Sequence, residues 1–175
     1  MTRSRTIFAL LTVIGLTLSV GSATANDNKR NKPEVVRAFL LGINETPSIS
    51  TNGSGRFRAV IDEDSQLITF TLTYENLTGT PFMAHIHIGE RHTAGGIMVW
   101  LCGGGPTAKP ACPTTNPAEV TGSISPADVA AVPNQGVVAG NFDQVLDAIR
   151  AGAAYVNVHT QPTFVAGEIR GQVRR

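Results

Sequence analysis

The sequence predicts an all-β domain, namely a Greek-key β-sandwich or barrel of about eight antiparallel strands with two short helices. Two observations support this prediction. Apolar and polar residues alternate with a period of two in several short runs, and groups of Gly, Asn, Asp and Pro separate these runs. At 175 residues the chain is long enough for one domain with a real core and too short for two domains of ordinary size.

The first 25 residues have the pattern of an export signal. Arg3 and Arg5 give a positively charged start, residues 7–20 form an apolar run, and residues 23–25 are a small-x-small cleavage site. The apolar run is shorter than the roughly 20 residues that a membrane helix needs, so we expect cleavage rather than an anchor.

The chain that remains after cleavage should consist of a polar, disordered lead-in at residues 26–33 and one domain at residues 34–175. Loss of residues 1–25 leaves 12 Lys and Arg against 13 Asp and Glu, a net charge of −1. This balance gives no attraction to nucleic acid or to an anionic membrane surface by charge alone. We expect neither a nucleic-acid partner nor a membrane span in the mature protein.

The first strands are predicted by strict alternation. In residues 68–75 an apolar side chain occupies every second position and mostly threonines fill the others, and residues 56–61 follow the same pattern. Turn-forming residues at 52–55, 62–65 and 76–81 separate these runs. The pattern is typical of a meander of short antiparallel strands.

Two short helices should interrupt the later strands. Residues 125–128 combine a serine N-cap, a proline at the first helical position and an early acid. Asn141 can cap a second helix, whose apolar residues then fall at i, i+3, i+4 and i+7 before Gly152 ends it. Strand-like segments follow at residues 153–160 and 165–173.

Histidines are placed at alternate positions in the segment Met-Ala-His-Ile-His-Ile-Gly, which begins at Met83. In a strand, Met83, His85 and His87 share the face opposite the core. The later strand-like segment at residues 153–160 has the same alternation, which places Asn157 and His159 on its outer face. If the two strands are neighbours, about 4.8 Å apart, the three histidines could converge on one ion.

Imidazole nitrogen suits copper and zinc, so one of these is the expected cofactor. His92, in the loop that follows, could complete the site or remain in solvent, and the thioether of Met83 would favour Cu(I). Glu168 could accept a hydrogen bond from a histidine and fix its tautomer, and Asn157 is a second candidate for such a supporting role. The alternative is that the histidines only form hydrogen bonds with nearby backbone or carboxylates, without metal.

The two cysteines, Cys102 and Cys112, flank a stretch rich in Gly and Pro. In an oxidising compartment this spacing suits a disulfide that closes one long loop. It excludes a CxxC redox or zinc motif. Two free thiols acting as soft metal ligands are the alternative.

Four ordered motifs resemble the successive signatures of the CHRD (chordin) domain family and together cover residues 35–174: residues 41–47, 84–89, 151–160 and 167–172. The family's Glu-x-Pro-Pro appears here as Glu45-Thr-Pro-Ser, a small departure in a loop. The resemblance implies an exported or extracellular β-rich domain with no established catalytic activity.

The His-x-His strand is also similar to the copper-ligand strand of copper/zinc superoxide dismutases, so the fold should be superoxide-dismutase-like in outline. A dinuclear copper–zinc site needs more than the four histidines present, which leaves only a mononuclear site open.

The function expected from these features is a non-enzymatic periplasmic or secreted protein that binds copper or zinc through His85, His87 and His159. The loop between Cys102 and Cys112 would partly cover the site. One alternative is a metal-free module whose partner is an extracellular or periplasmic protein. Another is a mononuclear copper enzyme like superoxide dismutase, which requires an open coordination position.

Overall fold

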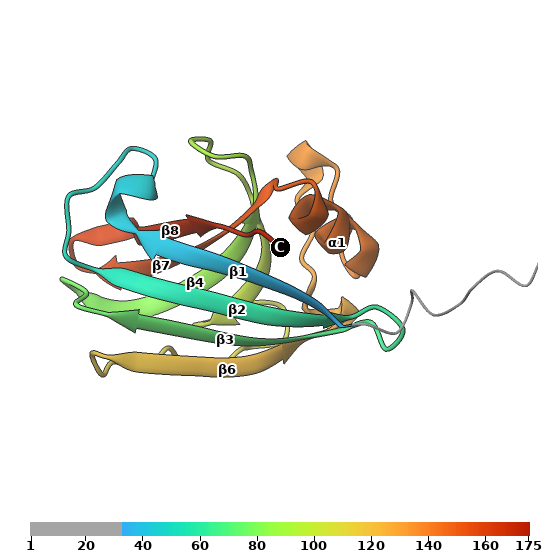
Figure 1. Cartoon of the computed structure of the whole chain (residues 1–175), viewed down its shortest axis with the longest axis horizontal. Coiled ribbons are helices and arrows are strands. Elements are labelled where there is room, and N and C mark those ends of the chain that lie inside the picture. The colour runs from blue at the N-terminus through green and yellow to red at the C-terminus, as the bar shows by residue number, and fades with distance from the viewer. Residues whose placement is uncertain (1–32) are drawn as a thin grey trace, which may run out of the picture. The chain divides into compact units, whose positions relative to one another are not determined.

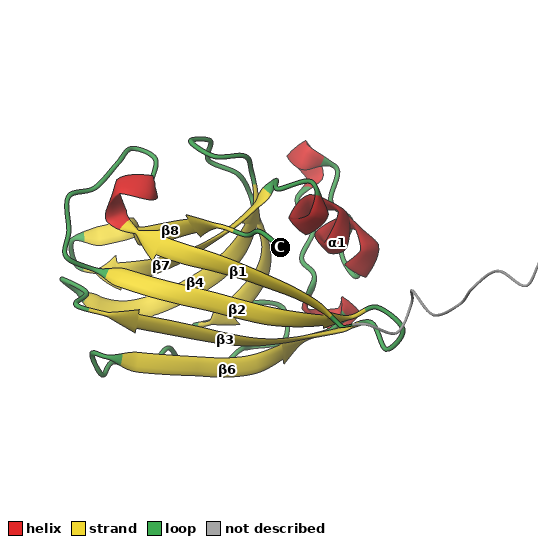
Figure 2. Cartoon of the chain, viewed as in Figure 1, coloured by secondary structure: helices red, strands yellow, loops and turns green. Residues whose placement is uncertain are grey.

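The computed structural model describes residues 33–175, and the expected signal peptide and all but the last residue of the lead-in lie outside the described residues. The described chain forms eight strands and one α-helix (Figures 1 and 2), with the bounds β1 Glu34–Leu41, β2 Ser54–Asp62, β3 Leu67–Glu75, β4 Thr80–Ile88, β5 Ile97–Cys102, β6 Ala118–Ile124, α1 Phe142–Arg150, β7 Ala154–Gln161 and β8 Phe164–Gln172. Within this part of the chain no helix is both long and apolar enough to cross a bilayer.

The strands form a single antiparallel sheet in the order β5-β4-β7-β8-β1-β2-β3-β6. The edge strands β5 and β6 contact each other, so the sheet curls into a nearly closed barrel. After the β4–β5 hairpin and β6, strand β7 returns to lie beside β4, which is a Greek-key connection (Figure 1). The predicted all-β Greek-key fold is therefore confirmed.

The alternation read from the sequence marks the barrel interior. In β3 the residues at alternate positions, from Ile68 to Tyr74, are buried in one apolar core, while the threonines between them are more exposed. Strand β2 supplies Phe57, whose ring lies 6.1 Å from that of Phe70. Side chains fill the interior, as expected of a small barrel.

Only one of the two predicted helices is an α-helix. Helix α1 begins after Asn141, whose side chain accepts a hydrogen bond from the Gln144 backbone N–H at 3.2 Å, and its apolar face is buried. The segment after Ser125 makes a single 3-10 turn over Pro126–Asp128. The helix stops there because Val129 turns to an extended conformation and packs into the core.

Candidate metal centre

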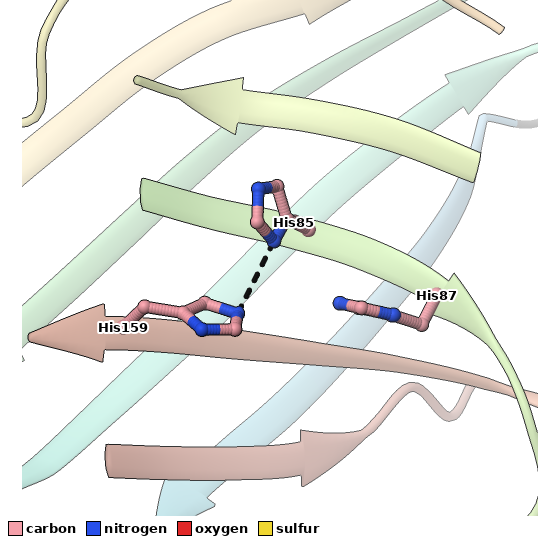
Figure 3. A group of neighbouring side chains, drawn as sticks. All are labelled: His85, His87 and His159. Carbon is pink, nitrogen blue, oxygen red and sulfur yellow. Dashed lines mark hydrogen bonds between the residues drawn. The ribbon is translucent and has the colours of Figure 1, made fainter. Parts of the chain in front are cut away.

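The two strands that carry the histidines, β4 and β7, pair directly, so the condition for a shared site is met. In their ladder His85 lies opposite Asn157 and His87 lies opposite Tyr155, while His159 lies one row further along. Residues directly opposite each other in an antiparallel pair point to the same face. All three histidines therefore lie on the side of the sheet turned away from the barrel core (Figure 3).

The imidazoles of His85, His87 and His159 point toward one another. The distance from Nδ1 of His85 to Nε2 of His159 is 3.2 Å, and each histidine offers one nitrogen such that all three lie within 4.8 Å of one another. Bonds of about 2.0–2.1 Å to a tetrahedral ion place two ligand nitrogens about 3.3 Å apart. The spacing between His85 and His159 already matches that geometry.

This outer face is nevertheless buried. His85 is fully buried, and His87 and His159 are each 7% exposed. Three aromatic rings from β4, β5 and β7 lie against the imidazoles, with ring-centre distances of 5.3 Å for Trp100 and His85, 4.7 Å for Tyr155 and His87, and 6.2 Å for Phe82 and His159. The histidines thus sit in a second, aromatic core outside the barrel.

Phe82 reaches this core because of a β-bulge. Alternation predicts that Phe82 faces the barrel interior together with Ala84. In the structure Pro81 lies opposite Thr160 and Met83 lies opposite His159, so Phe82 is an extra residue in β4. The bulge shifts the alternation, and the half-buried Phe82 ring meets the His159 ring nearly edge-on.

Backbone carbonyls fix the tautomers of two of the histidines. Nδ1 of His87 lies 2.8 Å from the Gly95 carbonyl oxygen, and Nδ1 of His159 lies 3.0 Å from the Val165 carbonyl oxygen. A carbonyl only accepts, so each Nδ1 carries the hydrogen and each neutral ring keeps its lone pair on Nε2. Metal-ligating histidines in proteins are oriented in this way.

Burial also keeps the rings neutral. It lowers the pKa of His85 to about 3, with a further lowering by His159 and His87. Burial likewise lowers the pKa of His87 to about 4, and that of His159 below its ordinary value. Since His159 presents a lone pair on Nε2, Nδ1–H of His85 donates to it.

Two buried nitrogens are left without a partner. Nε2 of His85 and Nε2 of His87 make no hydrogen bond with any described residue. A buried polar atom without a partner usually costs about 1–3 kcal/mol. Nε2 of His87 is turned toward the other two histidines, whereas Nε2 of His85 lies on the far side of its ring from His159 (Figure 3), so one unpartnered lone pair faces the group.

A buried polar network that the sequence did not predict lies beside the histidines. Oδ1 of Asn157 is 3.1 Å from Nε2 of His159, so Asn157 does contact a candidate ligand. The carboxyl of Glu45 lies near Asn157, and burial raises its pKa to about 7 although the guanidinium of Arg170 acts in the opposite direction. That guanidinium lies 3.4 Å from the ring centre of Tyr155.

In the sequence, Glu45 stands out only as part of the CHRD-like motif at residues 41–47. Arg170 is buried, which alternation alone did not predict. Its Nη2 donates to the Glu90 carbonyl oxygen at 2.9 Å and so ties the loop after β4 to β8.

Two further candidate ligands have different positions. His92 lies exposed in the loop after β4 and does not belong to the histidine group. Met83 is half-buried and lies opposite His159 in the ladder, on the face of the histidines.

The predicted role of Glu168 is wrong. Its carboxylate accepts hydrogen bonds from the Thr51 hydroxyl at 2.7 Å, the Thr78 backbone N–H at 2.7 Å and the Thr160 hydroxyl at 2.6 Å, and it bonds to no histidine. The prediction failed because the β7–β8 register is irregular just before Thr160, so alternation counted back from Arg170 does not hold at Glu168.

Cys102 and Cys112 lie in disulfide geometry, as the spacing favoured. The loop that they close packs on Trp100. Gly105 has a φ of +93°, and a Cβ at this position would lie 2.8 Å from the Cβ of Trp100, so only glycine allows the approach. The loop therefore contacts the histidine group indirectly, through the ring that lies against His85.

Comparison with known proteins agrees with the motifs. A family model described as the CHRD domain matches residues 36–173. No curated protein and no solved structure matches. Because the family model covers most of the chain, from the first strand to the residue after the last one, the protein belongs to the CHRD domain family.

Proposed function

We propose that this protein is an exported, non-enzymatic metal-binding protein that holds one copper or zinc ion between His85, His87 and His159. One observation carries the proposal: each of three buried imidazoles offers a ligand nitrogen within 4.8 Å of the other two, and the one from His87, Nε2, has no partner among the described residues. A protein that used these histidines only for structure would be expected to satisfy their nitrogens.

Export is proposed on two grounds. Residues 1–25 have the pattern of a cleavable signal, and Cys102 and Cys112 lie in the disulfide geometry favoured in the periplasm or outside the cell. The protein would therefore meet metal ions in a compartment that is periplasmic or extracellular.

The burial of the site favours holding an ion over catalysis. A dismutase-like copper enzyme needs an open position that its substrate can reach. His85 is fully buried, and the rings of Trp100 and Tyr155 lie against the ligands. An enzyme is therefore the weaker candidate.

A protein-interaction module is the second candidate, and a specific observation favours it. On β1, Phe39 is 64% exposed and Leu41 is 44% exposed, and both line a groove that extends over β2, β3 and β6. Apolar side chains exposed together can mark an interaction surface. This role is compatible with metal binding, since the groove and the histidines involve different residues.

The deciding experiment is the metal content of the purified protein. The protein would be produced in cells supplied with copper and zinc and compared with the triple variant His85→Ala, His87→Ala, His159→Ala. We expect about one equivalent of metal in the parent, by the one-ion geometry, and none in the variant. His92→Ala is the matched control, because it removes an exposed histidine outside the group and should keep the metal.

Circular dichroism must show that the triple variant is folded, because three buried side chains are truncated. If the triple variant does not fold, the metal binding of the parent protein alone decides the question. A parent protein that is purified without metal and then takes up neither Cu(I), Cu(II) nor Zn(II) would refute the proposal.

A further inference from the structure

We infer that the three-histidine site is selective for a monovalent copper ion, Cu(I), over divalent Zn(II) and Cu(II). The inference rests on the proposed function and specifies which metal the site binds and in which oxidation state. Three properties of the described residues support it: the charge of the surroundings, the number of histidine ligands, and a soft donor on the same face of the sheet.

The first property is charge. Neutral imidazoles leave the charge of a bound ion unchanged, and no carboxylate or thiolate belongs to the group of ligand atoms within residues 33–175. Two charged groups of the polar network beside the histidines, Glu45 and Arg170, act on each other with opposite sign, so together they supply no net negative charge. Arg170 also disfavours a positive charge at His87.

Taking an ion out of water costs free energy that rises with the square of its charge. At a site without a compensating anion, a divalent ion therefore pays a much larger penalty than a monovalent one. The charge of the site thus favours Cu(I) over both divalent ions.

The second property is the number of ligands. Structural zinc is almost always four-coordinate, and catalytic zinc adds a water molecule to three protein ligands. Here the side-chain group holds three nitrogens, and the aromatic rings of Trp100, Tyr155 and Phe82 lie against the imidazoles. A buried group of three nitrogens with aromatic rings against them suits an ion that accepts a low coordination number.

The third property is a soft donor on the same face of the sheet. Met83 is directly opposite His159 in the β4–β7 ladder, so its side chain starts from the same face as the imidazoles. A thioether is a soft ligand, which selects Cu(I) over zinc. If Met83 approaches the ion, it adds a fourth neutral donor without adding charge.

The test compares three ions on one protein. The metal-free parent would be titrated anaerobically with Cu(I) against bicinchoninate, with Zn(II) against a chromogenic zinc indicator, and with Cu(II) followed by electron paramagnetic resonance. We expect one equivalent of Cu(I) to bind at least about 100-fold more tightly than Zn(II), and no stable Cu(II) signal from this site. Since the parent protein is used throughout, the result does not depend on a variant that folds.

The outcomes separate this inference from the proposal beneath it. Zn(II) bound as tightly as Cu(I), or a stoichiometric Cu(II) signal, would overturn the selectivity and leave metal binding intact. Failure to bind any of the three ions would overturn both. His92→Ala should reproduce the parent's selectivity, and Met83→Leu should weaken Cu(I) binding while leaving any weak Zn(II) binding unchanged.

Discussion

Nδ1 of His85 and Nε2 of His159 lie 3.2 Å apart and share one proton, although each belongs to a different strand. The same two atoms are candidate metal ligands. An ion that binds between them would replace a hydrogen bond by two coordinate bonds, and the proton would move from Nδ1 of His85 to Nε2 of the same ring, which has no partner among the described residues. The strands therefore already hold the two ligands at coordinating distance, so little ordering remains to oppose binding.

Metal binding should stabilise the fold. A ligand that binds only the folded chain adds about 2.7 kcal/mol to the free energy of unfolding at 100 times its Kd, which corresponds to several degrees in Tm. We expect this rise on addition of Cu(I), and its reversal by a chelator, in thermal unfolding followed by circular dichroism. His159→Gln keeps a polar side chain at the position but should lose the rise, whereas His92→Ala should keep it.

The sequence was sufficient to predict the all-β Greek-key fold and the outward-facing positions of the histidines. Alternation in residues such as Ile68 and Phe70 assigns the core face of a strand directly, because a strand repeats every two residues. The same rule assigns His85 and His159 to the outer faces of their strands, and the pairing of β4 with β7 brings the two side chains together.

Other parts of the site could not be read from alternation, because they depend on irregular backbone. The bulge at Phe82 turns an expected core residue toward His159, and the irregular β7–β8 register gives Glu168 other partners. Burial of His87 also depends on a loop, since Gly95 lies eight residues further along the chain and contacts His87 only in the folded protein. The local alternation of apolar and polar residues gives no information on which loop covers a strand.

Glu168 should support the fold and not the metal. Its carboxylate is buried and joins β8 to Thr51, Thr78 and Thr160. Truncation by Glu168→Ala leaves these donors without an acceptor and should lower the free energy of unfolding by about 2–4 kcal/mol, while Glu168→Gln should cost less. Chemical denaturation measures both. Unchanged Cu(I) affinity in folded Glu168→Gln separates this role from a supporting role at the metal, which would weaken binding.

The stability of the metal-free protein should fall in acid. Burial lowers the pKa of His85 to about 3 and that of His87 to about 4, against about 6.5 for an unfolded histidine. Between pH 6.5 and 4 the unfolded chain therefore binds protons that the folded chain does not, and the free energy of unfolding decreases as the pH falls. The loss should amount to a few kcal/mol and appear as a lower Tm at pH 4 than at pH 7.

Protonation of Glu45 acts against this loss of stability, and a Glu45 variant provides the control. Burial raises the pKa of Glu45 to about 7, whereas the carboxyl of the unfolded chain keeps its ordinary, lower pKa. Between these two pKa values the folded chain binds a proton that the unfolded chain does not bind. This contribution grows as the pH falls. Glu45→Gln removes it, so the Tm of the variant should fall more steeply with acid than that of the parent. A Tm that stays level between pH 7 and 4 in both proteins would contradict the neutral, buried state of the histidines.

Trp100 should report occupation of the site. It is the single tryptophan of the sequence, and its ring centre lies 5.3 Å from that of His85. Copper quenches indole emission at such short range, whereas zinc, which has no redox chemistry, does not. We expect one equivalent of Cu(I) to abolish most of the emission of the parent and of His92→Ala, but not of folded His159→Gln. Emission that stays constant while an independent assay shows bound copper would place the ion away from His85.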